Sequence, residues 1–138
     1  MMKLPSLSTS LDLHLVVAGN DTLPVRARLE YDAADPFAVR ATFQVPRTPS
    51  PVCWVFARDL LVDGLTGPAG AGDVGVWPST SEGQDIVCLS LTAPGGHALL
   101  QTPRAELQGF VDAMLDAVPP GRETAHLDMD AELAALLD

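Results

Sequence analysis

The chain has 138 residues and a mass of 14.5 kDa, which suits one domain that folds around its own core without a disulfide or a metal. Its net charge of −10 would repel a phosphate backbone, so the composition argues against nucleic acid as a partner. No apolar run approaches the ~20 residues of a transmembrane segment, and the N-terminus lacks a secretory pattern. We therefore expect a cytoplasmic protein.

Three segments in the first third of the chain alternate between apolar and polar residues, with the two-residue period of half-buried strands. They cover residues 7–17, 25–31 and 39–45. Because short turns separate them, they are predicted to form an antiparallel meander.

A proline-rich stretch over 46–51 follows the third strand and is predicted to be a loop or a sheet edge, since proline lacks a ladder donor. A fourth strand is expected from Val52 to Ala57. Residues 58–63 then lose the alternation and end at Gly64, which predicts a short helix followed by a glycine-rich loop.

The second half of the chain contains three more predicted strands, over 75–78, 85–92 and 97–101. Thr102 is the expected N-cap and Pro103 the expected first residue of a helix whose apolar stripe reaches Val118.

A last short helix is expected over 128–137, with Leu133 and Leu136 on one face that docks on the sheet or on a partner protein. The order of elements predicts a single α+β domain over residues 1–138. It has two groups of antiparallel strands, a short helix after the first group, and C-terminal helices.

No motif in the sequence points to catalysis or to a cofactor. The glycine-rich loop over 67–73 lacks the Gly-Lys-Ser/Thr ending of a phosphate-binding loop. The three histidines have no neighbours at metal-ligand spacing. Cys53 and Cys88 lie within apolar runs and are predicted to be reduced core residues. We expect a non-enzymatic protein without cofactors or metals.

Three arginines, Arg26, Arg28 and Arg40, share the polar face of the predicted meander and suggest a single-stranded nucleic-acid-binding module as an alternative function. The aromatic residues that would stack on bases are missing from this face, and Glu30 interrupts the basic stripe. Pairing of these arginines with acidic residues on neighbouring strands is the favoured prediction.

The most informative segment runs from Trp54 to Leu65, with the sequence WVFARDLLVDGL. It resembles the hallmark stretch of the SsgA-like proteins, an actinobacterial family of sporulation and cell division. Further matches occur in the same order along almost the whole chain: Leu23-Pro24-Val25, the residues from Tyr31 to Val39, Ala41-Thr42-Phe43, Gly72-Asp73-Val74, Val76-Trp77-Pro78-Ser79, and Val118-Pro119-Pro120-Gly121.

The resemblance is strongest to the SsgB branch and implies a non-catalytic homotrimer with a fold like that of the plant whirly proteins. It further implies recruitment of the tubulin-like division protein FtsZ to future septum sites, and promotion of FtsZ assembly. FtsZ and other SsgA-like proteins are thus the implied partners. The implied location is the cytoplasmic side of the division septum, with membrane association only through those partners.

The aromatic residues Trp54, Phe56 and Trp77 are candidates for the core or for a subunit interface, because aromatic side chains dominate such contacts. Arg58 and Asp59 are candidates for partner binding, together with Leu133 and Leu136. The alternative for Arg58 and Asp59 is a local cap and ion pair.

Overall fold

The structure, a computed structural model, describes residues 5–46 and 48–124. Its elements are β1 (Ser6–Val16), the 3-10 turn η1 (Ala18–Asn20), β2 (Thr22–Asp32), β3 (Ala38–Gln44), β4 (Val52–Ala57), α1 (Arg58–Gly64), β5 (Val74–Ser81), β6 (Gln84–Ala93), β7 (Gly96–Pro103) and α2 (Arg104–Ala117). Every strand predicted from the sequence is confirmed, as are the short helix, the long helix and the α+β class. The helix predicted over 128–137, with Leu133 and Leu136, lies outside the described residues.

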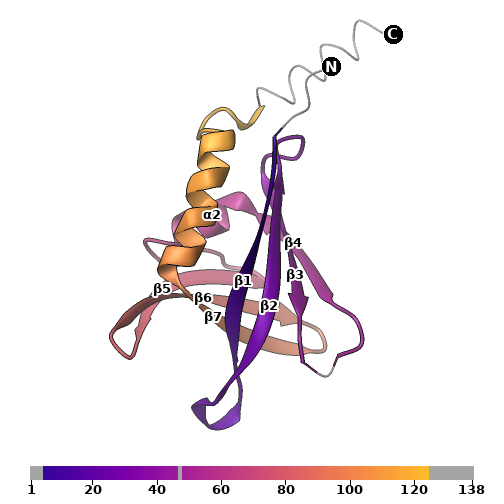
Figure 1. Ribbon diagram of the computed structural model, residues 1–138, viewed down its shortest axis with the longest axis vertical. Helices are drawn as coiled ribbons and strands as arrows, with labels where there is room; N and C mark the ends of the chain where they lie inside the picture. The colour runs from indigo at the N-terminus through magenta and orange to yellow at the C-terminus, as the bar shows by residue number, and fades with distance from the viewer. Residues whose placement is uncertain (1–4, 47, 125–138) are drawn as a thin grey trace, which may run out of the picture.

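All seven strands belong to one antiparallel sheet in the order β4-β3-β2-β1-β7-β6-β5. The two predicted strand groups are visible within it, because β1–β4 stand upright while β5–β7 run across them (Figure 1). The groups meet where β1 pairs with β7, and only two residue pairs join them, His14 with Gln101 and Leu15 with Leu100. The result is a half-barrel whose inner face is concave.

The core fills this concave face and is closed by α2. Alternate residues of the strands point inward, and the most deeply buried of them include Val39, Ala41 and Val76. Four residues of α2 at helical spacing complete the core: Leu107, Phe110, Val111 and Met114. α2 contacts β1, β6 and β7, whereas α1 contacts β4 and β5. Among the described residues, no helix combines the length and the apolar character needed to cross a bilayer.

The predicted start of α2 was wrong by one residue. Pro103 occupies the N-cap position, and no side chain caps the helix. Thr102 remains in β7, opposite Val87, with 5 % of its surface exposed. The inward strand position buries its methyl group but leaves its hydroxyl without a hydrogen bond in the described part of the chain. Strand pairing therefore took precedence over helix capping.

The prediction that both cysteines are buried was correct for Cys88, which lies on the outer face of the sheet opposite Trp77 and outside the core cluster, and wrong for Cys53. Cys88 is 4 % exposed, and this burial raises the pKa of its thiol. Cys53 is exposed because Trp54 takes the inward position in β4, which turns the preceding residue to the outer face.

β5 is longer than predicted, since it continues through Pro78 to Ser81. Proline is tolerated there because β5 is the last strand of the sheet, with β6 on one side and a single bridge from Val76 to Ala69 on the other in the described residues. A two-residue turn at Glu82 and Gly83, both with positive φ, connects it to β6.

Candidate interaction surfaces

Arg58, at the start of α1, is a buried cation rather than a surface residue. Only 2 % of it is exposed. Its Nη1 donates hydrogen bonds to the hydroxyl of Tyr31 at 2.9 Å and to the carbonyl oxygen of Val118 at 2.8 Å. Its Nη2 lies 3.0 Å from Oε1 of Glu123 and forms an ion pair with it. The guanidinium thus joins β2, α1 and the segment that follows α2.

Tyr31 completes this arrangement from the inner face of β2. Its hydroxyl accepts the bond from Arg58 and donates one to the carbonyl oxygen of Pro36 at 3.0 Å. Burial raises the pKa of Tyr31, although the neighbouring Arg58 opposes the rise. In the sequence, Tyr31 continues the apolar alternation of residues 25–31. A tyrosine at an inward strand position needs a partner for its hydroxyl, and that requirement was the signal for a buried polar cluster.

Arg58 and Asp59, the two charged candidates for partner binding, therefore differ in burial. Arg58 forms its ion pair with Glu123, far along the chain, and not with its neighbour Asp59. Asp59 is exposed in the first turn of α1, where a carboxylate complements the helix dipole. Of these two side chains, only that of Asp59 is exposed.

Trp54 and Phe56 both point inward from β4 but differ in exposure. Phe56 is buried in the core. Trp54 is half-buried and lines an apolar groove of about 280 Å³ at the open end of the half-barrel. We call it the mouth groove; its lining includes Phe43, Val45, Val52, Trp54, Leu91 and Ala98.

Trp77 lies on the opposite, outer face of the sheet. Its neighbour Val76 is fully buried on the inner face, so the alternation turns Trp77 outward, opposite Cys88 of β6. The ring lies close to Gly75, where a Cβ would stand 3.5 Å from its Cζ3 atom. Trp77 is half-buried, and with Leu99 it forms an apolar part of the outer face of β5–β7, which also carries the hydrogen-bonded pair Ser90 and His97.

The outer face of β1–β3 carries the three arginines in a mixed-charge pattern. Arg26 lies opposite Asp12, and Arg40 lies opposite Glu30. Arg28 donates a hydrogen bond from Nε to Ser8 at 2.9 Å and lies 3.9 Å from Glu30. Glu30 belongs to the same strand as Arg28, so this pair is not the predicted pairing with an acidic residue on a neighbouring strand, whereas Arg26 and Arg40 do lie opposite acidic residues of neighbouring strands. The outward positions of these three strands include no aromatic side chain.

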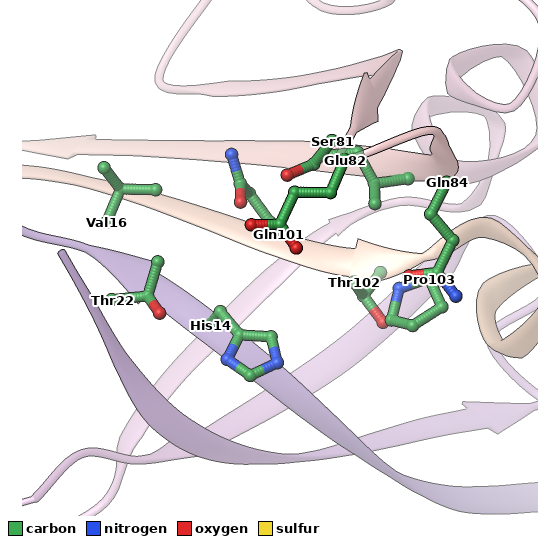
Figure 2. Close-up of a pocket in the computed structure, with 10 residues that line it drawn as sticks. His14, Val16, Thr22, Ser81, Glu82, Gln84, Gln101, Thr102 and Pro103 are labelled. Carbon is green, nitrogen blue, oxygen red and sulfur yellow. The ribbon is translucent and has the colours of Figure 1, made fainter. Parts of the chain in front are cut away.

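A polar cavity of about 480 Å³ lies where β1 meets β7, beside the β5–β6 turn (Figure 2). His14, Gln101 and Glu82 are among the side chains that line it. It holds one histidine and one carboxylate but no nucleophile paired with a base. No group of three metal-binding side chains occurs in residues 5–46 and 48–124. The lining combines polar side chains of β1 and β7 with the β5–β6 turn.

Comparison with known proteins assigns a family to this arrangement. The family model described as "Streptomyces sporulation and cell division protein, SsgA" matches residues 25–123. The sporulation-specific cell division protein SsgB of Streptomyces coelicolor is 51% identical over 132 residues, which cover 96% of each chain. The SsgB protein of Frankia casuarinae is 47% identical over 96% of this chain and 92% of its own.

Two solved structures are similar along nearly their whole length. One comes from work on mutations in SsgB that correlate with longitudinal cell division during sporulation of Streptomyces coelicolor. It aligns with a TM-score of 0.85 at 49% identity and covers 91% of this chain and 98% of that one. An SsgA-like sporulation-specific cell division protein from Thermobifida fusca aligns with a TM-score of 0.87 at 36% identity and covers 98% of both chains.

Proposed function

The chain belongs to the SsgA family of sporulation and cell division proteins, in its SsgB branch, and from that membership we propose that it is a non-catalytic adaptor of sporulation-specific cell division. In this role it recruits FtsZ to future septum sites and promotes FtsZ assembly. The observation that carries the proposal is the likeness to SsgB proteins along almost the entire chain, in sequence and in fold.

The distribution of polar groups supports a binding role rather than catalysis. The buried polar cluster at Arg58 is built from the chain's own Tyr31, Val118 and Glu123, and its hydrogen bonds hold elements of the fold together. Apolar side chains, by contrast, remain partly exposed at Trp54 and Trp77. Partly exposed aromatic residues are enriched at protein interfaces.

We propose that the chain is a single domain that acts on the cytoplasmic side of the division septum and reaches the membrane only through partners. One sheet and one core that include both strand groups support the single domain. The whirly-like fold stays a prediction.

The recruitment proposal predicts that the protein co-sediments with FtsZ polymers at low salt. Asp59→Ala is expected to weaken this co-sedimentation severalfold, because Asp59 is an exposed charge of the family segment, in the first turn of α1. Gln108→Ala, a change on the exposed side of α2, is the matched control and should co-sediment like the wild type. Absence of co-sedimentation by the wild-type protein would refute the FtsZ proposal.

We propose a homotrimer in which the outer face of β5–β7 is buried between copies, with Trp77 at its centre. Light scattering is expected to give about three times the chain mass. Trp77→Ser should raise the dissociation constant of the trimer by about 30-fold, because aromatic hot spots contribute about 2 kcal/mol or more. Leu23→Ser, a change at an exposed apolar residue of β2, is the control. A single-chain mass at every concentration would contradict the trimer.

Single-stranded nucleic-acid binding is the weaker candidate. Arg26, Arg28 and Arg40 do share one face of the sheet. Asp12 and Glu30 are interleaved with them, however, and the face offers no aromatic platform for bases. The net charge of −10 further disfavours a polyanion.

A further inference from the structure

β4 is an edge strand of the sheet, and every second residue of it directs its backbone groups away from β3. The N–H of Arg58 donates to the carbonyl oxygen of Phe37 at 2.8 Å, so these two residues form a bonded pair that continues the register of the β3–β4 ladder. Because bonded and non-bonded pairs alternate in an antiparallel ladder, Cys53, Val55 and Ala57 occupy non-bonded positions. Their backbone N–H and C=O groups therefore face the open edge.

The two ends of this edge differ from a regular strand. Ala57 is the N-cap of α1, so its carbonyl oxygen accepts the first hydrogen bond of the helix and only its N–H remains for the edge. Pro51, the next residue of the same alternation before β4, has a carbonyl oxygen but no N–H. Between them, Cys53 and Val55 each keep an N–H and a C=O without a hydrogen bond in the described part of the chain.

A second copy of β4, related to the first by a two-fold axis through Trp54, would match each of these groups. In this antiparallel register Cys53 of one copy lies opposite Val55 of the other, and the two residues exchange both hydrogen bonds. Ala57 lies opposite Pro51, so its N–H meets the carbonyl oxygen of the proline. The proline has no N–H that needs a partner, and the carbonyl oxygen of Ala57 already has one. Every free group of the edge is thus paired.

A shift of the two-fold axis by one residue leaves a backbone group unpaired. With the axis through Cys53, the carbonyl oxygen of Val55 faces Pro51, which has no N–H to donate. With the axis through Val55, the N–H of Cys53 faces the carbonyl oxygen of Ala57, which the helix already occupies. Because an unpaired polar group in a contact costs free energy, the register centred on Trp54 is favoured.

The side chains of β4 suit the same register. Natural sheets protect their edges with charges or prolines, and the six residues of β4 include neither. On the outer face, Val55 is 57 % exposed and would pack on the exposed Cys53 of the second copy. On the inner face, the two Trp54 side chains would lie opposite each other at the mouth groove. Aromatic pairs across antiparallel strands are favourable.

The charges near this edge do not oppose the contact. Arg40 of β3 lies opposite Val55 on the outer face. It lines a hollow that also contains three carboxylates, those of Glu30, Asp32 and Asp35. The Arg40 residues of the two copies would stand three strand spacings apart, about 14 Å, which exceeds the Debye length of about 8 Å at physiological salt. Repulsion between them is therefore weak.

From these observations we infer that β4 is a contact surface between two copies of this chain, which pair edge to edge about a two-fold axis through Trp54. The pairing extends the sheet from one copy into the other. It uses a surface distinct from the outer face of β5–β7, so it doubles whichever assembly that face forms. The inference goes beyond the adaptor role and does not depend on it.

Light scattering over a range of protein concentrations tests the contact. With increasing concentration, the wild-type mass should rise to at least twice that of Val55→Lys, a variant whose charge on the edge should raise the dissociation constant about tenfold. The mass of this variant is three chains if the proposed trimer forms and one chain if it does not, so failure of the trimer leaves the test intact. Leu23→Lys, at an exposed apolar residue of β2, is the matched control and should behave like the wild type.

Disulfide cross-linking with the oxidant diamide tests the register. Val55→Cys places its thiol opposite Cys53 of the second copy, at a Cα separation of about 5.5 Å that suits a disulfide, so a non-reducing gel should show linked chains. Combining Val55→Cys with Cys53→Ser leaves the two introduced thiols on a diagonal of about 7–8 Å. Linkage should then be at least about tenfold slower, because this separation exceeds the disulfide range.

A wild-type mass equal to that of Val55→Lys at every concentration would overturn the inference and leave the edge to a strand of another protein. Cross-linking of Val55→Cys at the same rate with and without Cys53→Ser would also overturn it, because the register would then be wrong. Val55→Cys keeps the inference testable if Val55→Lys does not fold.

Discussion

Replacement of Arg58 by alanine is expected to lower the free energy of unfolding by about 3 kcal/mol, because it removes one partner of a buried ion pair. Three groups lose their donor at once: the Tyr31 hydroxyl, the Val118 carbonyl and the Glu123 carboxylate. The carbonyl of Val118 is left inside the fold, since that residue is 1 % exposed. A buried acceptor without a donor costs about 1–3 kcal/mol.

Urea unfolding followed by tryptophan fluorescence measures this loss. Arg28→Ala is the matched control, because it removes an arginine whose pair with Glu30 is exposed, and it should change the stability by less than about 1 kcal/mol. Equal losses for the two variants would show that burial of Arg58 contributes nothing to stability. Asp59→Ala, by contrast, should leave the free energy of unfolding nearly unchanged. Its effect on co-sedimentation with FtsZ can then be attributed to binding and not to a loss of stability.

Replacement of Gly64 by alanine is expected to cost about 2–3 kcal/mol. Gly64 is the last residue of α1 and is buried against β5. A Cβ at this position would overlap the side chain of Val76 and would lie 3.2 Å from its backbone carbonyl carbon. Val76 is fully buried and pairs with Leu89, so neither its side chain nor its strand can move aside cheaply.

Gly109→Ala is the control for this substitution, and the opposite sign is expected. Gly109 is exposed in the middle of α2, and apart from its chain neighbours and the backbone of its own helix, no atom of the described residues lies within 4 Å of the position that its Cβ would take. Alanine should therefore stabilise the protein by about 0.5–1 kcal/mol through helix propensity. Thermal unfolding of both variants gives the comparison. A loss of stability below about 0.5 kcal/mol for Gly64→Ala would contradict the close packing of α1 on β5.

The sequence predicted the strands well because alternation is a local signal that survives wherever one face of a sheet is buried. β1, β2 and β3 each keep that pattern, and their observed bounds differ from the predicted ones by only a few residues at either end. The family could also be predicted from the sequence, because the segment from Trp54 to Leu65 resembles the family in both its strand and its helix start. This prediction is confirmed.

The errors arose where a residue's environment depends on distant parts of the chain. Cys53 lies in an apolar run, but the run alone does not show which of its residues face inward. In the structure Trp54 faces inward, so Cys53 faces outward. Arg58 follows β4 directly, yet its partner Glu123 lies beyond α2. Likewise, the helix-capping signal at Thr102 was overridden by pairing with β6. No local sequence pattern predicts any of these contacts.

The short pairing of β1 with β7, which joins the two strand groups, also affects how quickly the protein folds. β1–β4 and β5–β7 are each built from neighbours along the chain, so hairpins can form them early at little cost in loop entropy. The pairing of Leu15 with Leu100 and the contact of Arg58 with Glu123 close long loops instead. We therefore expect the folding rate to be limited by the pairing of β1–β4 with β5–β7. The guanidinium of Arg58 then binds the segment that follows α2.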